Sequence, residues 1–353
     1  MGVDIPHGTT TMNTPVFEIS AQGVVDQYEY TQELVDHVYF SAKTNYDVVS
    51  ILQDRTDAGF SIHFEHALEH TRRDDTVIFH ANSVTPDQLS RLRSDGIDTF
   101  VVDNPADLNI LESWLNGDVG PVTVLLRLQR RENTVETGKH YAYGLSSTVV
   151  NNAVPRLADQ EAVRNIGVHV HRKTQNVAEW RLRDELDDVL DDETKHAIDV
   201  VNAGGGIPVQ YHNYQRDVKP AIEQRFKELR EWTDTIQADL IIEPGRIISG
   251  PPGRLKTTIT NVYDDTVVID ASVYNAAMDT FVTNTRLPIM EETESGDPYT
   301  VKGCTPDSLD ILRYKARLNN PERGDTLTFD NATAYNYSSD FCDLPEPRTN
   351  IIE

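Results

Sequence analysis

The chain has 353 residues, of which 57 are acidic and 32 basic, so its formal net charge is −25. Nucleic acids and anionic membranes would repel so negative a protein, which argues against either as a partner. The length is sufficient for one large domain and a smaller one.

The acid excess is spread along the whole chain, and lysine is scarce, with 9 lysines against 23 arginines. This composition indicates a halophilic protein that works in high salt; an acidic protein from an ordinary environment is the alternative. Cys304 and Cys342 are the only cysteines, which argues against a disulfide framework or a zinc site. No apolar run approaches about 18 residues and no signal peptide is recognisable, so we expect a soluble protein in a reducing, cytoplasmic setting.

Residues 1–13 are polar and predict a flexible N-terminus. A short strand is expected at 16–19, followed by weak helical character over 24–36. A regular alternation of strand-like and helix-like segments then begins. Its strand-like runs end near eight residues, which are Lys43, Ile62, His80, Val102, Leu128, His171, Ala203 and Glu243.

Helix signals fall between these runs, the first over residues 45–55. Thr85-Pro86-Asp87-Gln88 has the pattern of a capping box with proline at the first helical position, and Gly96 ends that helix. Asn104-Pro105 starts the next helix in the same way. Residues 214–236 predict a long, charged helix. The apolar face of this last helix includes Ile222, Phe226, Leu229 and Trp232.

Eight β-α units within residues 36–248 fit a (β/α)8 TIM barrel, which is an α/β fold. A doubly wound open sheet is the alternative, since a strand count from one sequence can err by about one or two. After residue 248 the helical signals fade, and short β-rich runs appear. They indicate a C-terminal β-sandwich or β-barrel domain (249–353) that takes in the N-terminal strand with residues 14–35.

Lys43 ends the first strand-like run of the barrel, in the segment Ala42-Lys43-Thr44-Asn45. A lysine at the end of a buried strand must be desolvated or paired, which lowers its pKa and makes the amine nucleophilic. Such an amine suits a Schiff base with pyridoxal 5′-phosphate (PLP). The alternative is a lysine just beyond a strand that faces solvent.

Two glycine-containing turns follow the last two strands of the expected barrel, where such barrels often bind phosphate. Gly204-Gly205-Gly206 lets backbone N–H groups approach a phosphate closely. Glu243-Pro244-Gly245-Arg246 adds another glycine and a guanidinium. His171 ends the sixth strand. Each motif alone is weak, but together with Lys43 they fall at the positions where a barrel carries its active site.

Six segments carry a clear resemblance to a known family, over nearly the whole chain from about residue 14 to residue 341. The chain resembles the PLP-dependent decarboxylases with an alanine-racemase-like (fold type III) barrel, which act on ornithine, lysine, arginine and diaminopimelate. The segments are Ala42-Lys43-Thr44-Asn45, Gly167-Val168-His169-Val170-His171, Gly204-Gly205-Gly206-Ile207-Pro208, Glu243-Pro244-Gly245-Arg246, Asp307-Ser308-Leu309-Asp310 and Phe329-Asp330-Asn331-Ala332-Thr333-Ala334-Tyr335.

The resemblance implies an amino-acid decarboxylase that works through a Schiff base on Lys43 and a quinonoid intermediate. It implies that His171 stacks on the cofactor ring, that Glu243 binds the pyridine nitrogen and that Arg127 lies near the cofactor. It also implies a homodimer with active sites at the interface. The residues it places at the phosphate are Gly204, Gly205, Gly206, Gly245, Arg246 and Tyr335. We interpret His169 as structural, on the opposite side of its strand from His171.

The sequence departs from the family pattern at several places. Arg172-Lys173-Thr174 stands where the family often has Gly-Ser-Gly, and Thr174 could retain a hydroxyl contact to the phosphate. Asn202 replaces a usual acid, and Ser61 stands where ornithine decarboxylases carry an aspartate. In the segment 303–307 a proline occupies the position of the proton-donating cysteine. Either Cys304 takes over that role, or another group donates the proton and Cys304 is structural.

The substrate class rests on two aspartates. Asp307 matches the position at which ornithine-type enzymes bind the distal ammonium of the substrate across the dimer, and Asp279 lies where diaminopimelate enzymes need an arginine. Both point to a basic amino acid, and the product would be a polyamine or a natural-product building block; a surface role for either aspartate is the alternative.

Two other functions remain open on the sequence alone. An amino-acid racemase or epimerase on the same barrel would need a second acid/base, for which Tyr274 is the only candidate. A catalytically silent regulator is suggested by the altered cysteine segment. Retention of Lys43, Glu243 and Arg246 argues against a silent protein.

Overall fold

The computed structural model describes residues 14–130, 143–172, 181–214 and 217–353. The N-terminal segment 1–13, for which we predicted flexibility, lies outside this part of the chain. The described chain divides into two compact units. One comprises residues 24–210 and 216–248, and the other comprises residues 1–23, 211–215 and 249–353, in each case without the segments not described.

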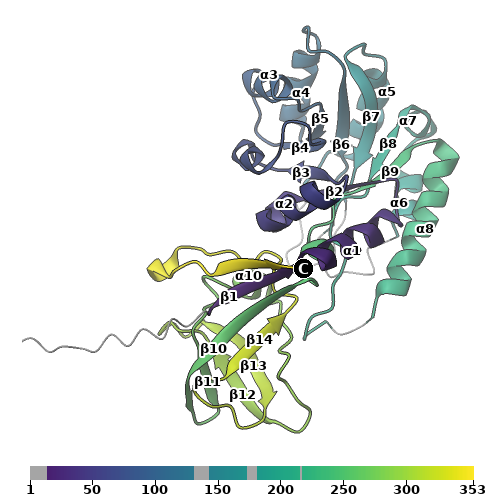
Figure 1. Cartoon of the computed structure of the whole chain (residues 1–353). Coiled ribbons are helices and arrows are strands. Elements are labelled where there is room, and N and C mark those ends of the chain that lie inside the picture. The colour runs from purple at the N-terminus through teal and green to yellow at the C-terminus, as the bar shows by residue number, and fades with distance from the viewer. Residues whose placement is uncertain (1–13, 131–142, 173–180, 215–216) are drawn as a thin grey trace, which may run out of the picture. The chain divides into compact units, whose positions relative to one another are not determined.

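The larger unit is a closed barrel of eight parallel strands in the order β2 to β9, with β9 pairing back to β2 (Figure 1). This confirms the TIM barrel and excludes the open sheet. Each strand ends within two residues of the end expected from the sequence. The strands are β2 (His37–Ser41), β3 (Gly59–Ile62), β4 (Val77–Ala81), β5 (Thr99–Val102), β6 (Val122–Arg127), β7 (Val163–His169), β8 (Val200–Asn202) and β9 (Asp239–Ile242).

Helices connect these strands and lie outside the ring in Figure 1. The α-helices that belong mainly to this unit are α1 (Ala21–Gln32), α2 (Tyr46–Arg55), α3 (Pro86–Ser94), α4 (Pro105–Leu115), α5 (Ser147–Ala158), α6 (Leu182–Val189), α7 (Asp192–Ala197), α8 (Lys219–Ile236) and α9 (Arg246–Ser249). Two short 3-10 helices, η1 (Ala42–Thr44) and η2 (Glu65–His70), follow β2 and β3.

Side-chain caps define where several helices begin. The Asn45 side chain accepts from the backbone N–H of Asp47, the Thr85 hydroxyl from that of Gln88, and the Asn104 side chain from that of Asp107. These caps satisfy N–H groups that have no partner inside the helix. Gly96, at a φ of +100°, follows α3 as the sequence predicts.

The smaller unit is built around a mixed sheet in the order β13-β12-β11-β10-β1-β15, with β14 also paired to β10. Residues 16–19 therefore do form a strand, and it pairs antiparallel with β10 as part of the β domain. The elements of this unit are β1 (Val16–Ser20), β10 (Gly253–Tyr263), β11 (Thr266–Ile269), α10 (Met278–Thr283), β12 (Asp297–Lys302), β13 (Ile311–Leu318), β14 (Thr326–Asp330), η3 (Phe341–Asp343) and β15 (Arg348–Ile352).

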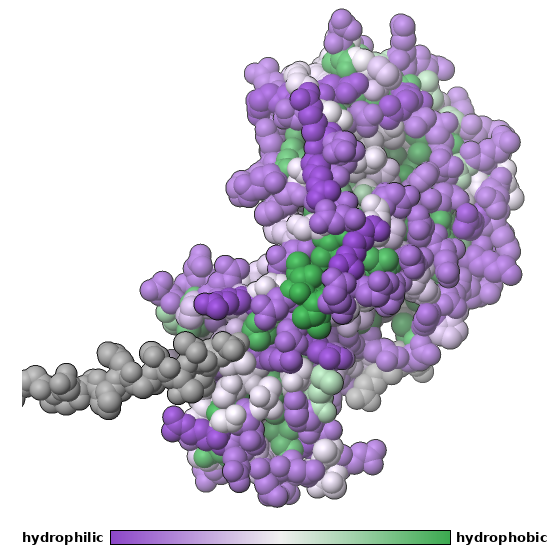
Figure 2. Space-filling model, viewed as in Figure 1, coloured by the Kyte–Doolittle hydropathy of each residue, from purple (hydrophilic) through white to green (hydrophobic). Residues whose placement is uncertain are grey.

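Within the described residues, no helix has both the length and the apolar composition needed to cross a membrane. The face shown in Figure 2 is mostly hydrophilic, as expected from the acid excess.

Candidate active site

Alternate side chains along the barrel strands face the barrel interior, and this alternation determines which residues form the site. A buried apolar cluster is formed by Ile78, Val101, Leu125, Val200 and Ile241, with Tyr39 packed against it. Side chains two residues apart in a strand face the same side. The residues two places further along are His80, Asp103, Arg127, Asn202 and Glu243. A polar layer therefore lies beyond the apolar one, at the C-terminal ends of the strands, where barrels of this kind carry their active sites.

Lys43 lies in η1, directly after β2. Its Nζ atom is 3.0 Å from Nε2 of His63, which follows β3. Burial lowers the pKa of the Lys43 amine, and Arg127 adds to this, while the Glu243 carboxylate acts in the opposite direction. A lysine whose pKa is lowered has a larger fraction of neutral, nucleophilic amine at neutral pH. The structure thus places Lys43 in a desolvated position rather than in solvent.

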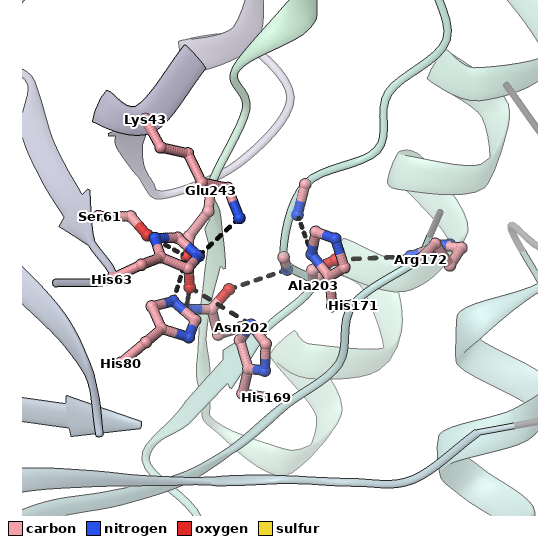
Figure 3. A network of polar contacts seen from close by, with 12 residues as sticks. Lys43, Ser61, His63, His80, His169, His171, Arg172, Asn202, Ala203 and Glu243 are labelled. Carbon is pink, nitrogen blue, oxygen red and sulfur yellow. Dashed lines mark hydrogen bonds and ion pairs between the residues drawn. The ribbon is translucent and has the colours of Figure 1, made fainter. Parts of the chain in front are cut away.

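Glu243, directly after β9, is only 4% exposed and lies at the centre of the polar layer. Its Oε2 atom accepts hydrogen bonds from the Ser61 hydroxyl and from Nε2 of His80, the latter at 2.7 Å (Figure 3). Its Oε1 atom accepts a hydrogen bond of 2.6 Å from Nδ2 of Asn202. Burial alone would raise the pKa of Glu243, yet His80, His169 and Ser61 together hold this pKa well below its ordinary value. Glu243 is therefore a stable carboxylate in the barrel interior.

Ser61 and Asn202 gain a clear role from this geometry. Both replace acids of the family pattern, and both donate a hydrogen bond to Glu243. An acid at either position would place a second negative charge against a buried carboxylate, which is costly unless one of the two is protonated. The side-chain Oδ1 atom of Asn202 also accepts a hydrogen bond of 2.8 Å from the Gly204 N–H, so Asn202 links Glu243 to the glycine turn.

Our prediction that His169 lies on the opposite side of its strand from His171 was wrong. His169 lies on the same side of its strand as His171, since residues two apart face alike, and the two rings stack with centroids 6.4 Å apart. Nε2 of His169 is 3.4 Å from Oε1 of Glu243, and the residue is fully buried. Burial lowers the pKa of His169 well below its usual value, against the pull of Glu243.

His171 lies beside the glycine turn. Its Nδ1 atom accepts a hydrogen bond of 3.4 Å from the Gly205 N–H, as Figure 3 shows. Burial, followed by the charges of Arg127 and Lys43, lowers the pKa of His171 well below its usual value. A neutral imidazole in this position presents a flat, uncharged face to a ligand.

The glycine turn after β8 is compact. Gly204 and Gly206 have φ values of +63° and +88°, which favour glycine over other residues. A Cβ atom on Gly205 would lie 2.6 Å from the Glu243 carbonyl oxygen. A Cβ atom on Gly245 would lie 2.0 Å from the Thr44 hydroxyl, so the loop after β9 packs directly on the segment that holds Lys43. Arg246 follows, 4% exposed, as the first residue of α9.

A cavity of about 380 Å³ opens beside this layer. Its walls include His63, His80, Asp103, Arg127 and Tyr143. The Arg127 guanidinium lies 5.5 Å from the centre of the Tyr143 ring. The volume is in the range of sites that bind small molecules.

The other candidate residues belong to the smaller unit, apart from Thr174, which lies outside the described residues. Tyr335 is half-buried at a φ of +61°, and Asp279 is buried in the first turn of α10. Cys304 is exposed, while partial desolvation of its thiol and the nearby Asp310 raise its pKa. Asp307 accepts hydrogen bonds from the Leu309 N–H at 2.9 Å and from the Tyr274 hydroxyl at 2.8 Å.

Sequence reasoning did not assign His63 and His80 to the site. The rings of these two histidines stack with centroids 4.2 Å apart and planes 7° apart. The available signal was positional, because each histidine lies at the C-terminal end of a barrel strand, as Lys43 and Glu243 do. The sequence does not show which strand ends are in contact, so it could not predict that His63 stacks on His80.

The sequence is similar to those of known proteins. A family model described as "Pyridoxal-dependent decarboxylase, pyridoxal binding domain" matches residues 24–250. A diaminopimelate decarboxylase of Pseudomonas fluorescens is 23% identical over 370 residues, which cover 95% of this chain and 86% of that protein.

Two solved structures have a similar fold. Diaminopimelate decarboxylase from Helicobacter pylori, complexed with L-lysine, has a TM-score of 0.83 at 17% identity and covers 97% of this chain and 92% of its own. Lysine decarboxylase from Selenomonas ruminantium has a TM-score of 0.80 at 17% identity, with coverages of 96% and 93%.

Proposed function

Because this chain belongs to the family of pyridoxal-dependent decarboxylases, we propose that it removes the α-carboxyl group of a basic amino acid, with Lys43 as the residue that binds PLP covalently. The chain is a PLP-dependent amino-acid decarboxylase by family. The proposal for Lys43 rests on one observation. A desolvated lysine amine and a buried carboxylate, that of Glu243, lie at the same end of the barrel and act on each other electrostatically.

The residues of the barrel fit the three polar parts of PLP. Lys43 offers an amine for the aldehyde. Oε1 of Glu243 accepts one hydrogen bond from a described residue, and a carboxylate oxygen can accept a second, so it has capacity for a protonated pyridine nitrogen. The turn Gly204–Gly206, Gly245 and the Arg246 guanidinium offer backbone and side-chain donors to the phosphate.

When bound, PLP takes up the electron pair that is left on the substrate carbon as carbon dioxide departs. The protein residues prepare for this. Glu243, kept ionised by His80, His169 and Ser61, favours a proton on the ring nitrogen. His171, kept neutral, offers its face to the ring. Ser61 and Asn202 hold the carboxylate in place from two different strands.

The proposed preference for a basic substrate rests on Asp307 and Asp279. Hydrogen bonds from the Leu309 N–H and the Tyr274 hydroxyl lower the pKa of Asp307, so it is ionised at neutral pH. An ionised carboxylate attracts a distal ammonium and repels a distal carboxylate. Asp279, in the first turn of α10, would add to this selection.

We propose Cys304 as the donor that returns a proton to the substrate carbon. A thiol whose pKa is raised stays protonated at neutral pH, as such a donor must. Replacement of Cys304 by alanine should then slow turnover. Unchanged kinetics and an unchanged product would assign this thiol a structural role only.

The same local geometry argues against a racemase. Burial of the phenol, together with its hydrogen bond to Asp307, raises the pKa of Tyr274 to about 12. A phenol with this pKa is a poor base at neutral pH. Chiral analysis of the amino acid recovered from a reaction mixture tests the point, because a racemase would return both enantiomers.

The proposed function is tested by measuring release of carbon dioxide from L- and D-ornithine, lysine, arginine and diaminopimelate by the PLP-loaded protein in high salt. We expect release from a basic L-amino acid. Lys43→Ala should abolish it, whereas Lys227→Ala, at an exposed position of α8, should not. A Lys43→Ala protein with parental turnover would contradict the assignment of Lys43.

The homodimer implied by the family resemblance also remains a proposal. Sedimentation equilibrium of the PLP-loaded protein in high salt would give twice the chain mass of 39.8 kDa for a dimer. A fully active protein with the mass of a single chain would contradict the homodimer.

A further inference from the structure

His63 is a partly buried imidazole whose position the proposed reaction does not yet explain. It follows β3 by one residue and Ser61 by two, so both side chains face the barrel interior. Ser61 donates to Glu243 and His63 contacts Lys43. One strand end thus connects the two groups on which the proposed function rests.

The contact between His63 and Lys43 is a hydrogen bond that both partners can donate or accept. At 3.0 Å, a Lys43 ammonium can donate to a neutral Nε2, or an Nε2–H can donate to a neutral Lys43 amine. The two forms differ only in the position of one proton. Burial lowers the pKa of both groups, and the lowering is larger for His63, so the resting proton lies on Lys43 and His63 is the neutral acceptor.

The ring of His63 is held in place by its neighbours. It stacks on the His80 ring, with centroids 4.2 Å apart and planes 7° apart, and Nε2 of His80 lies 2.7 Å from Oε2 of Glu243. The second ring nitrogen of His63, Nδ1, has no hydrogen-bond partner among the described residues. His63 also lines the cavity of about 380 Å³.

We propose that His63 is the proton-transfer partner of Lys43. In the forward direction an N–H bond of the Lys43 ammonium breaks, its electron pair stays on Nζ, and the proton forms a bond to Nε2 of His63. The step leaves a neutral amine on Lys43 beside an imidazolium at His63. The reverse step restores the ammonium. This inference rests on the proposed role of Lys43 as the PLP-binding residue.

The surroundings of His63 favour a neutral, accepting imidazole. Glu65, Asp103 and Arg127 line the same cavity as His63. The groups that shift the pKa of His63 are Lys43, His80, His169 and Glu243. Only Glu243 among them favours the imidazolium, and its oxygens already accept three hydrogen bonds from other residues. An imidazole that is neutral at pH 7 can accept a proton without first losing one.

The test measures the rate at which Lys43 bonds to PLP, and not turnover. PLP is removed from the full-length protein, fresh PLP is added, and the new absorbance of the carbon–nitrogen bond is followed by stopped flow between pH 6 and pH 9. His63→Ala should slow this step at pH 7 by about 10²-fold, the usual scale of general base catalysis. Its rate should also rise more steeply with pH, because only the lysine that is already neutral reacts.

Added imidazole should restore the rate of His63→Ala, with a pH dependence that follows the imidazole base. The matched control is His66→Ala, because His66 lies three residues after His63, in the short helix η2, but its side chain is 87% exposed and pairs with Glu69. The control should keep the parental rate and pH profile. Borohydride reduction and peptide mass spectrometry identify the lysine that has reacted.

Two outcomes would overturn the proposal while leaving the decarboxylase function intact. One is a His63→Ala protein with the rate and pH profile of His66→Ala. The other is a slow His63→Ala protein that imidazole does not rescue, which would show that the ring only shapes the site. If the parent protein reacts at a lysine other than Lys43, the assignment of Lys43 fails and the role of His63 fails with it.

Discussion

At the scale of single residues, the site is organised by one buried negative charge. Glu243 is surrounded by neutral donors, Ser61 and Asn202, and by histidines whose rings are held close to its oxygens. A carboxylate that accepts several hydrogen bonds is ionised at a lower pH than usual. The two substitutions that look like losses against the family pattern therefore stabilise the charge on which the cofactor chemistry depends.

This arrangement predicts a large effect of a second acid. Asn202→Asp would remove the amide group that donates a hydrogen bond of 2.6 Å to Glu243. It would also place a carboxylate beside Glu243 in a fully buried position. We expect the free energy of unfolding at pH 7 to fall by about 3 kcal/mol or more, the usual cost of an uncompensated buried charge. Urea unfolding measures it.

The control for this prediction is Asn116→Asp, which makes the same chemical change at an exposed position after α4. The deficit of Asn202→Asp should shrink as the pH falls towards 5, because the raised pKa of the carboxylate pair lets one member take up a proton. A deficit equal to that of Asn116→Asp would contradict our account of Glu243.

The buried histidines predict how stability depends on pH. The pKa of His169 in the folded protein lies well below its unfolded value of about 6.5, so below that pH the unfolded chain binds a proton that the folded chain does not. Folding stability must therefore fall as the pH drops from 7 to 5, by up to about 1.4 kcal/mol per pH unit for one such histidine. The pKa of Glu243 lies below this window.

Urea unfolding at several pH values tests this point. Between pH 6.5 and pH 5 the free energy of unfolding of His169→Gln should decline less steeply than that of the parent. The difference should be the contribution of one histidine, up to about 1.4 kcal/mol per pH unit. The matched control His66→Gln, at an exposed histidine, should leave the decline unchanged. An equally steep decline in His169→Gln would mean that His169 is protonated in the folded state.

At the scale of elements, the features that could be predicted from the sequence are those that depend on neighbouring residues in the chain. Strand ends followed from runs of apolar residues, and helix starts followed from capping residues such as Thr85 and Asn104. The same rules placed Lys43, His171 and Glu243 at one end of the barrel. They did not identify the contact of His63 with Lys43, because that contact joins two strand ends and depends on their register, Tyr39 opposite Gly59.

Helix α4 shows how an element supports the site from outside. Asp107, in its first turn, is 3% exposed and accepts hydrogen bonds from the backbone N–H groups of Ser83 at 2.7 Å and Val84 at 3.0 Å. Ser83 has a φ of +60°, so the loop after β4 adopts a conformation that the backbone alone disfavours. This loop begins next to His80.

Asp107→Ala should therefore lower the free energy of unfolding by about 2–4 kcal/mol, because a buried N–H group of Val84 and a partly buried one of Ser83 lose a charged acceptor. The matched control is Asp87→Ala, an acid in the first turn of α3 that is exposed. Urea unfolding compares the two proteins. Equal, small effects would show that Asp107 does not hold the loop.

At the scale of the whole molecule, the dominant property is the net charge of −25. Like charges at the surface destabilise the compact state, and the effect weakens as salt shortens the range of the interaction, from about 8 Å at 0.15 M to about 3 Å at 1 M. We expect the free energy of unfolding, measured with urea, to rise by about 1–3 kcal/mol between 0.1 M and 1 M potassium chloride. A general effect of salt on apolar burial would give a rise as well, so the charge itself must be varied.

A fourfold variant separates the two causes. Asp118→Asn, Asp188→Asn, Glu231→Gln and Asp234→Asn change exposed acids and reduce the net charge from −25 to −21. If repulsion dominates, the variant gains stability at 0.1 M salt and gains less from added salt than the parent, so the two proteins converge at 1 M. If the salt dependence of the two proteins is the same, the effect comes from apolar burial, and the acid excess serves solubility rather than folding in salt.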